Sequence, residues 1–228
     1  MRPAAGLGLE SSQLDDCIEE ISRSRLTSVF GSPSFGFHES DLNALARVPH
    51  VNAVWFWDVA LKNVDGLYAL DDLMEFGVHP KRPAIDFSKL PGLRRVVWEY
   101  KRQDTGMGSL EGLEALHSWR YRDASRTLCN LALPSNLVEL EINWANVETL
   151  DGLPSLPNLR RLEIHRCRNL RSLGAIDKLL PGLEHLVIAA CGRVEDQEGP
   201  RIVRQLARLK HAYVKDHVLP TTSTVPSQ

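Results

Sequence analysis

The sequence predicts an α/β solenoid with a parallel sheet on one side and 3₁₀ or extended segments on the other. The motif L-x-x-L-x-I-x-x-C occurs at Leu159–Cys167 and again at Leu183–Cys191, 24 positions later. From Leu42 onward, runs of apolar residues recur at every third position, which fits neither an α-helix nor a strand but does fit 3₁₀ or extended turns. Each run ends in two apolar residues two positions apart, which is typical of a short strand with both side chains inward.

The predicted strand centres recur at intervals of 20 to 26 residues. Such intervals are typical of architectures in which a short strand and its return segment stack on their neighbours with a period of about 20–29 residues. The pattern therefore extends well beyond the two copies of the motif. The predicted centres are Val54, Phe76, Val96, Trp119, Leu140, Leu162, Leu186 and Ala212.

The N-terminal segment lacks the repeat pattern. We expect disorder over residues 1–10 and an N-terminal cap over residues 11–40, because the end strand of a solenoid usually needs a capping element. Ser11–Asp16 is typical of a helix start, with acidic residues in the first turn and an apolar stripe after it. Leu26–Val29 is predicted to form a degenerate first strand.

The repeat domain is predicted over residues 41–217, followed by a mobile C-terminal tail over residues 218–228 that lacks apolar anchors. The last repeat differs from the others, because an amphipathic pattern beginning at Pro200 is typical of an α-helix with proline in its first turn. We expect this helix to precede the last strand at Ala212–Val214.

Composition narrows the class of protein. The 228 residues are 43% hydrophobic and 25% charged, as in ordinary folded domains, and the formal net charge of -2 argues against general nucleic-acid binding. No apolar stretch approaches the roughly 20 residues needed to cross a bilayer. Four scattered cysteines do not form a disulfide framework, so we expect a reduced, cytoplasmic protein. These cysteines are Cys17, Cys129, Cys167 and Cys191.

Over residues 42–217 the chain resembles the leucine-rich-repeat superfamily. The L-D-G-L-x-x-L-P-N-L run at Leu150–Leu159 looks like the internalin type of repeat, and the endings at Cys167 and Cys191 look like cysteine-containing repeats. The resemblance implies a curved solenoid, a horseshoe or arc, with a concave parallel sheet and short convex segments. It also implies a surface generally used to bind other proteins.

The chain departs from this family at the position that carries asparagine or cysteine. In the family, that side chain satisfies backbone groups of the turn, and buried backbone groups rarely stay unpaired. We therefore expect other hydrogen-bond partners, looser turns and less regular curvature in the earlier repeats. The residues at this position before Cys167 are Val59, Lys81, Lys101, Ala124 and Ala145.

Strand side chains alternate between core and surface, so the register predicts which residues face outward. Trp98 and Trp119 fall on inward positions and are predicted to lie in the core. Trp55 and Trp57 face outward, either as exposed interface anchors or as residues covered by the cap. The candidate partner-binding residues of the concave face are Trp55, Trp57, His79, Glu99, Arg120, Arg122, Glu141, Asn143, Trp144, Glu163 and His165.

Within this set, the strongest prediction is a binding hot spot on the later strands. Tryptophan and arginine are the residues that most often anchor protein interfaces. The predicted centre of the hot spot consists of Arg120, Arg122, Glu141, Asn143 and Trp144.

Opposite charges on adjacent strands predict lateral ion pairs across the outward face. Neighbouring parallel strands lie about 4.8 Å apart, which is close enough for such pairs to form. On a solvated sheet each pair contributes little to stability. The expected pairs are Glu75–Arg95, Arg120–Glu141 and Glu139–Arg161.

A zinc site is weighed against ordinary structural roles for four residues in the later repeats. His165 and His185 should point outward from the sheet, whereas Cys167 and Cys191 should point into turns at its edge. Four zinc ligands must converge tetrahedrally on one ion. We therefore expect no metal site here.

Two catalytic possibilities are weighed: a cysteine nucleophile, against which Cys167 and Cys191 occupy the structural position of the repeat, and a carboxylate pair formed by Glu141 and Glu163 on adjacent strands. Two carboxylates could serve acid–base hydrolysis, but an open face offers no pocket to exclude water. No glycine-rich phosphate loop follows a strand. We expect no enzymatic activity and no cofactor.

The favoured function is a non-enzymatic module that binds a partner protein on the concave sheet, as a stand-alone inhibitor, an adaptor or an immunity-type protein. The alternative is a scaffold or subunit of a larger assembly that uses its convex side or its ends. Neither hypothesis involves a nucleic acid or a membrane as the partner. Fold alone does not decide between them.

Overall fold

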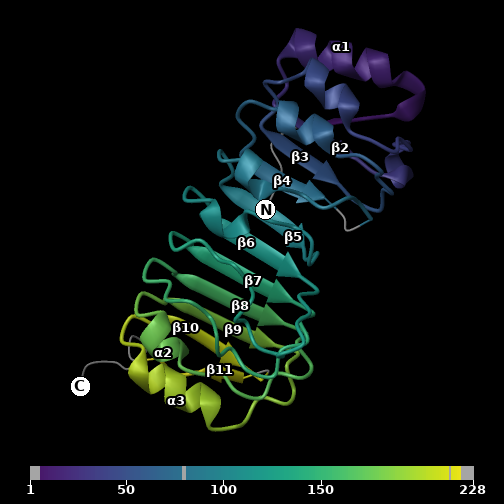
Figure 1. The fold of residues 1–228 in the computed structure, drawn as a ribbon. Helices are drawn as coiled ribbons and strands as arrows, with labels where there is room; N and C mark the ends of the chain where they lie inside the picture. Colours follow the sequence, from purple (N-terminus) through teal and green to yellow (C-terminus); the bar gives the residue numbers. More distant parts are fainter. Residues whose placement is uncertain (1–5, 79–80, 216, 222–228) are drawn as a thin grey trace. The chain divides into compact units, whose positions relative to one another are not determined.

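A computed structural model describes residues 6–78, 81–215 and 217–221. The chain forms two compact units, Met1–Gly112 and Leu113–Gln228, and each is described by itself. Both are built on the same plan: short parallel strands in chain order, joined by segments that contribute apolar side chains to the core (Figure 1).

The N-terminal unit contains five strands that pair in parallel and in chain order. They are β1 (Leu7–Gly8), β2 (Ser28–Gly31), β3 (Ala53–Phe56), β4 (Glu75–Val78) and β5 (Arg95–Glu99). One α-helix, α1 (Leu14–Ser24), contacts β1. The return segments hold short 3₁₀ turns, as the period of three predicts: η1 (Ser11–Gln13), η2 (Pro33–Phe35), η3 (Asn43–Arg47), η4 (Asp65–Ala69), η5 (Phe87–Lys89) and η6 (Met107–Ser109).

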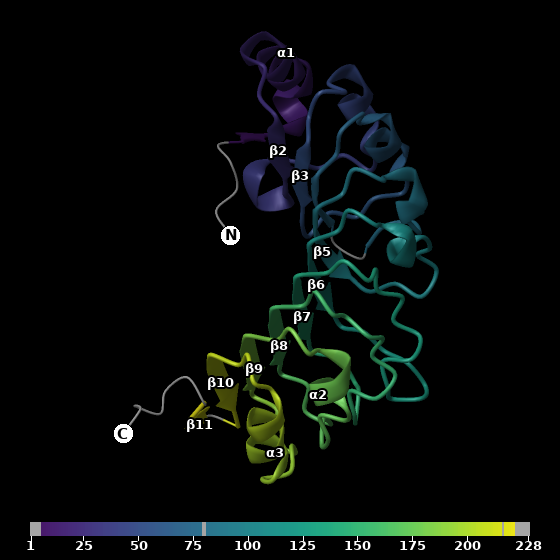
Figure 2. The ribbon, with the colours of Figure 1, turned by 90° about the vertical axis from the view of Figure 1, so that its left-hand side faces the viewer.

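The C-terminal unit contains five parallel strands and a sixth, antiparallel one. In Figure 2 the return segments lie to one side of these strands. The strands are β6 (Ala115–Trp119), β7 (Glu139–Asn143), β8 (Arg161–His165), β9 (His185–Ala189), β10 (His211–Val214) and β11 (His217–Leu219). The helices are α2 (Ile176–Leu179) and α3 (Glu198–Gln205).

The core is formed by strand-centre residues stacked from one repeat to the next. In the N-terminal unit Val54 pairs with Phe76 and Phe76 with Val96, and all three are buried. In the C-terminal unit the equivalent stack is Leu116, Leu140, Leu162, Leu186 and Ala212. Each fully buried leucine contributes about 1.5–3 kcal/mol relative to exposure, so register is strongly fixed.

The predicted register is correct for seven of the eight strand centres and wrong for β6. The centre of β6 is Leu116, which pairs with Leu140, and not Trp119. The sequence misleads because Ser118 occupies the second inward position and is fully buried, where the other strands carry an apolar residue. Trp119 and Tyr121 imitate the usual closing pair, but Trp119 is 36% exposed and only Tyr121 is buried.

The N-terminal cap contains the predicted helix and one strand that was not predicted. In α1, Ile18 and Ile21 are buried and the first turn is acidic, as the apolar stripe indicates. Residues 1–5 lie outside the described part, but Leu7–Gly8 pairs with β2 and Leu9 is buried, which corrects the expectation of disorder up to residue 10. The predicted first strand is therefore the second.

The C-terminal end also differs from the prediction. A mobile tail was expected from residue 218, yet His217–Leu219 forms β11 against β10. The Thr221 hydroxyl donates to the carbonyl of Lys210 at 3.3 Å, and Thr221 is buried. Residues 222–228 lie outside the described part.

A buried ion pair organises one turn of the N-terminal unit. At the turn positions nearby, Lys81 and Lys101 stand where the repeats that the sequence resembles carry asparagine. Arg82 donates from Nη1 and Nη2 to the two carboxylate oxygens of Asp104 at 2.8 and 2.7 Å, and both side chains are fully buried. Asp104 also accepts from the Ile85 backbone N–H and from Trp98 Nε1, each at 2.8 Å. Lys101 donates to the Arg82 carbonyl. At this turn, the hydrogen-bond partners predicted in place of asparagine are thus charged side chains.

This arrangement predicts a large loss of stability on removing Asp104. Asp104→Ala should lower the free energy of unfolding by about 3–5 kcal/mol, because it leaves a buried guanidinium and two donors without their acceptor. Urea unfolding followed by circular dichroism measures the effect. The exposed Asp72→Ala serves as control and should change stability by less than about 0.5 kcal/mol. Equal losses in the two variants would contradict the structural role of the pair.

Candidate partner-binding face

The candidate site is the outward face of the strands, on the side opposite the buried strand centres, and it is described for each unit by itself. In the N-terminal unit this face is aromatic. Trp55 on β3 is half-buried, and its ring lies over Gly77 of the adjacent strand β4. A Cβ atom at residue 77 would lie 2.5 Å from Trp55 Cε3, so only glycine leaves room for the ring in this position.

Trp57, just after β3, belongs to a cluster with Phe30 of β2 and Phe35 of η2. The Trp57 ring stacks on Phe30 at 6.0 Å between centroids and meets Phe35 edge-on at 5.9 Å. Trp57 remains 39% exposed and Phe35 53% exposed. Trp57 was expected to be either an exposed interface anchor or a residue covered by the cap. It combines the two, because its ring contacts Phe35 in the loop of the cap and is still partly exposed to solvent.

In the C-terminal unit the face is polar and centred on two carboxylates. Glu141 of β7 and Glu163 of β8 are direct register partners. Glu141 accepts from Asn143 Nδ2 at 2.6 Å and lies 3.5 Å from His117 Nδ1. A hollow of about 20 Å³ lies beside them, which is room for about one water molecule.

Glu163 is held on both sides by residues of its own strand. Its carboxylate pairs with Arg161 and lies 2.8 Å from His165 Nε2. Burial acts to raise the pKa of Glu163, but the hydrogen bond with His165 and the charge of Arg161 outweigh it, so the pKa lies below its ordinary value. Glu163 is thus a charged, oriented acceptor at neutral pH.

The expected lateral ion pairs form differently. Glu75 and Arg95 are register partners, as are Glu139 and Arg161, which fits the predicted rows. Arg161, however, pairs with Glu163 on its own strand. The predicted pairing of Arg120 with Glu141 rests on the wrong register of β6, because His117 is the residue opposite Glu141.

At the carboxyl ends of β6, β7 and β8, three bulky residues adopt a left-handed backbone. Arg120, Trp144 and Arg166 each have φ of 57°. Their backbone N–H groups donate to the next strand, Arg120 to Asn143, Trp144 to His165 and Arg166 to Ala189, at 2.8–2.9 Å. This conformation costs roughly 1–2 kcal/mol for a residue other than glycine.

Trp144 and Arg166 make a direct contact at this edge. The Arg166 guanidinium carbon lies 4.9 Å from the centre of the Trp144 ring, a cation–π geometry. Trp144 is 36% exposed, as is Trp119.

The structure brings together some of the predicted binding residues and separates others. Glu141, Asn143, Glu163 and His165 lie side by side on β7 and β8, as predicted, with Asn143 buried. Arg120 and Arg122 lie in the turn after β6, beyond the strand face on which they were placed. Glu99 ends β5 in the N-terminal unit, and His79 lies outside the described residues.

Sequence reasoning missed four residues of the face. His117 and Trp119 were not predicted on the face, because the strand centre of β6 was set at Trp119. Counting the register from Leu113-x-x-Leu116 puts both residues on the outward side. Phe35 comes from a loop that no periodicity covers. Arg166 was overlooked, although it immediately precedes Cys167 as Arg120 precedes Tyr121.

The cysteines and histidines of the later repeats have separate positions. Cys167 Sγ lies 3.5 Å from the His165 carbonyl, and Cys191 Sγ lies 3.3 Å from the Ala189 carbonyl, both in the interior. The hydrogen bond with Cys191, together with burial, raises the pKa of the Cys167 thiol. Among the described residues, no group of three or more histidine, cysteine or acidic side chains could hold a metal ion.

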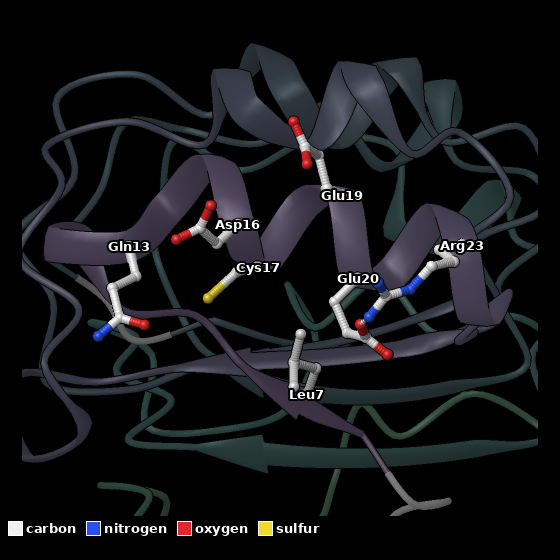
Figure 3. A pocket seen from close by; sticks show the side chains of 7 residues that line it. All are labelled: Leu7, Gln13, Asp16, Cys17, Glu19, Glu20 and Arg23. Atoms are coloured by element: carbon white, nitrogen blue, oxygen red, sulfur yellow. Dashed lines mark hydrogen bonds and ion pairs between the residues drawn. The ribbon is translucent and has the colours of Figure 1, made fainter.

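A second concave feature lies between α1 and β1 of the N-terminal unit. This groove of about 490 Å³ is lined by Leu7 and by one side of the helix. Figure 3 shows Cys17 and Glu20 pointing from α1 toward β1, whereas Glu19 points away; Arg23 is paired with Glu20. Within the described ranges, no helix has the length and apolar character of a membrane span.

Comparison with known proteins supports the architecture. No family model matches the sequence, and no curated protein matches it. Among solved structures, an internalin (InlF) from Listeria monocytogenes matches with a TM-score of 0.56 and 15% identity, over 94% of this chain and 67% of that chain. The chain has a leucine-rich-repeat fold. The functional domain of InlJ from Listeria monocytogenes, described as including a cysteine ladder, matches with a TM-score of 0.45 and 14% identity, over 84% of this chain and 41% of that chain.

The depressed pKa of Glu163 predicts how stability responds to acid. Because the folded pKa is below the ordinary value of 4.5, the stabilisation is complete above that value and is lost as pH falls through the folded value. Glu163→Gln should cost about 1–2 kcal/mol at pH 7 and much less at pH 3. Urea unfolding at both pH values measures this. The exposed Glu139→Gln is the matched control and should lower the free energy of unfolding by less than about 0.5 kcal/mol at pH 7. If Glu163→Gln lowered the free energy of unfolding equally at both pH values, Glu163 would not have a depressed pKa in the folded protein.

The thiols should differ sharply in reactivity. Cys129 is exposed, and a hydrogen bond with the Ser125 hydroxyl lowers its pKa, so iodoacetamide should modify it first in the native protein. Cys17 is partly exposed and should follow, whereas the buried Cys167 and Cys191 should react only after unfolding. Peptide mass spectrometry with and without urea measures the order. Modification of Cys167 in the native protein would be inconsistent with the packing described above.

Proposed function

We propose that this chain is a non-enzymatic module that binds a partner protein on the outward face of its parallel sheet. The observation that carries the proposal is the face of the C-terminal unit, which combines the oriented carboxylates of Glu141 and Glu163 with Trp119 and Trp144, each 36% exposed, at the carboxyl ends of β6 and β7. Tryptophan, with arginine, is the residue type most enriched in the anchors of protein interfaces. The module would act as an inhibitor, an adaptor or an immunity-type protein.

Preorganisation of the face supports binding. The outward residues sit on strands joined by a continuous backbone ladder, and Asn143, His117, His165 and Arg161 hold the carboxylates in place. Side chains that are already ordered lose little conformational entropy when a partner arrives. In the N-terminal unit, the exposed cluster of Phe30, Phe35 and Trp57 has the same character.

The same geometry favours binding over catalysis. Glu141 and Glu163 are adjacent, as an acid–base pair requires, but the hollow beside them is only about 20 Å³. Small-molecule sites usually enclose about 300–1,000 Å³ so that water is excluded. The carboxylates are therefore better suited to meet donors of a partner surface than to act on an enclosed substrate.

The class of partner and the cellular location form part of the proposal. A net charge of -2 and carboxylates at the centre of the face favour a protein over a nucleic acid. Four free cysteines support a reducing, cytoplasmic environment.

Site-specific photo-crosslinking tests the proposal. A photoreactive amino acid is placed at Val187, in the middle of the face on β9, and the protein is irradiated in an extract of its native host. Matched probes replace Ser155, exposed in the segment between β7 and β8, and Glu19, on the solvent side of α1. We expect a discrete protein adduct from position 187 that excess wild-type protein removes.

The competing protein provides the second arm. Unlabelled Trp119→Ala/Trp144→Ala should compete at least about tenfold less well than wild type, because buried tryptophan anchors carry much of the binding energy. Val218→Ala removes another exposed apolar side chain, on β11, and should compete as well as wild type. Adducts formed only from position 155 or 19 would contradict the proposal and support the scaffold alternative.

A further inference from the structure

The outermost strand of the N-terminal unit has an unpaired edge among the described residues. β1 is the first strand of the sheet, and its strand partner is β2. The Leu9 backbone N–H donates to the Phe30 carbonyl, so the preceding residue, Gly8, directs its own N–H and C=O away from β2. This edge can accept a further strand. Because β1 is only two residues long, backbone pairing alone would hold such a strand weakly.

One groove flanks this edge on the side of α1. It is the groove of about 490 Å³ described above, and Figure 3 shows Cys17 and Glu20 of α1 opposite Leu7 of β1. Cys17 Sγ lies 3.8 Å from the Gly8 carbonyl, at the unpaired edge. Carboxylates outnumber cations in the lining, so the groove is acidic. Its charged residues are Asp16, Glu19, Glu20 and Arg23.

A second groove flanks the same edge on the outward side. It measures about 530 Å³, and its lining includes Gly8, Phe30 and Phe35, with Glu10 as its charged residue. A Cβ atom at residue 8 would lie 3.0 Å from Phe30 Cε2, so the Phe30 ring lies over Gly8. Phe35 meets Phe30 edge-on at 5.5 Å between centroids and is 53% exposed. This groove therefore presents two aromatic rings beside the unpaired edge.

We infer that this end of the N-terminal unit binds an extended segment of another protein, which adds a strand beside β1. Successive side chains of a strand point to opposite faces, so the segment places alternate residues in the acidic groove and in the aromatic groove. Complementarity specifies a segment that is basic at the positions facing α1 and aromatic or aliphatic at the positions facing Phe30 and Phe35. In such docking, backbone bonds contribute affinity and the alternate side-chain sites contribute specificity.

A segment of another protein fits this edge better than a second copy of the chain does. β11 is the other end strand among the described residues, and its residues, His217–Leu219, include no lysine or arginine to meet the acidic groove. A nucleic-acid strand would bring phosphates against Asp16 and Glu20 and would be repelled. The inference goes beyond the proposed function and does not rest on it, because the grooves lie at the end strand of the N-terminal unit.

Fluorescence anisotropy of a labelled peptide, titrated with the full chain, tests the inference. The probe is a seven-residue peptide that alternates lysine with phenylalanine. We expect saturable binding of this peptide. A peptide of the same composition, in which the lysines all precede the phenylalanines, should bind at least about tenfold more weakly, because only the alternating order serves both grooves.

Two variants remove the chemistry of the two grooves separately. Asp16→Asn/Glu20→Gln should weaken binding of the alternating peptide about fivefold, as expected for the loss of two partly exposed ion pairs. Phe35→Ala should weaken it by a similar factor, because an aromatic contact is lost. Circular dichroism of each variant verifies that the fold is kept.

Matched controls change side chains of the same kinds elsewhere in the N-terminal unit. Asp71→Asn/Asp72→Asn neutralises two exposed carboxylates, and Met74→Ala removes an apolar side chain that is 42% exposed. Both variants should bind the alternating peptide as wild type does.

Cys17 gives a second readout that reports where the peptide lies. A strand beside β1 would cover the Cys17 thiol, which already contacts the Gly8 carbonyl. Saturating peptide should therefore slow alkylation of Cys17 by iodoacetamide at least about fivefold. Cys129 is exposed in the C-terminal unit and should react at an unchanged rate, so it serves as the internal control. Peptide mass spectrometry follows both thiols.

Several outcomes would overturn the inference: equal binding of the two peptides, equal loss in the groove and control variants, or unchanged alkylation of Cys17 at saturation. Self-association in sedimentation that the groove variants abolish would also overturn it, because the edge would then belong to a second copy. The crosslink from position 187 reports on the C-terminal unit. Its absence beside retained peptide binding counts against the proposed function alone, and its presence beside failed peptide binding counts against this inference alone.

Discussion

The backbone ladder between neighbouring strands is the constraint on which the rest of this fold depends. Every strand is only two to five residues long, so no strand is stable without the next. Pairing must be in register, because a slip of one residue would turn the buried leucines outward and the outward charges into the core. The ladder continues past the strands through the backbone N–H groups of Arg120, Trp144 and Arg166, and so it also holds the first residue of each following turn.

The turns after the strands show how one backbone requirement is met by different chemistry. In the C-terminal unit, Cys167 and Cys191 place thiols against strand-end carbonyls. In the N-terminal unit, a turn is organised by the buried pair of Arg82 and Asp104. A charged pair tolerates substitution of one partner poorly, whereas a thiol can be replaced by a small apolar residue, as Ala145 illustrates.

Much of the fold could be predicted because the apolar positions repeat without interruption. From Val54 to Val96 and from Leu140 to Ala212, each inward position is apolar, and the register follows from counting. Strand β6 could not be placed in this way, because the buried Ser118 removes one of its two signals. The two-residue strand β1 has too few residues to show any period, and β11 falls after the last repeat.

The candidate face was predicted as far as the register allowed. Glu141, Asn143, Glu163 and His165 were placed correctly, because a side chain on a strand has only two directions to choose from. Trp57 could not be assigned, because its exposure depends on Phe35, which approaches from a loop. Arg120 was selected for its residue type, but its position depends on a left-handed turn that the sequence does not reveal.

The shortness of the outermost strands has a consequence for behaviour at high concentration. Among the described residues, β1 has two residues and β11 has three, and β11 runs against the direction of β10. An unpaired strand edge is a template for adding another chain, and its hazard grows with its length. These short edges expose few unpaired N–H and C=O groups. A second copy of the chain therefore finds few backbone groups with which to extend the sheet, although most of the chain consists of repeats that stack on one another.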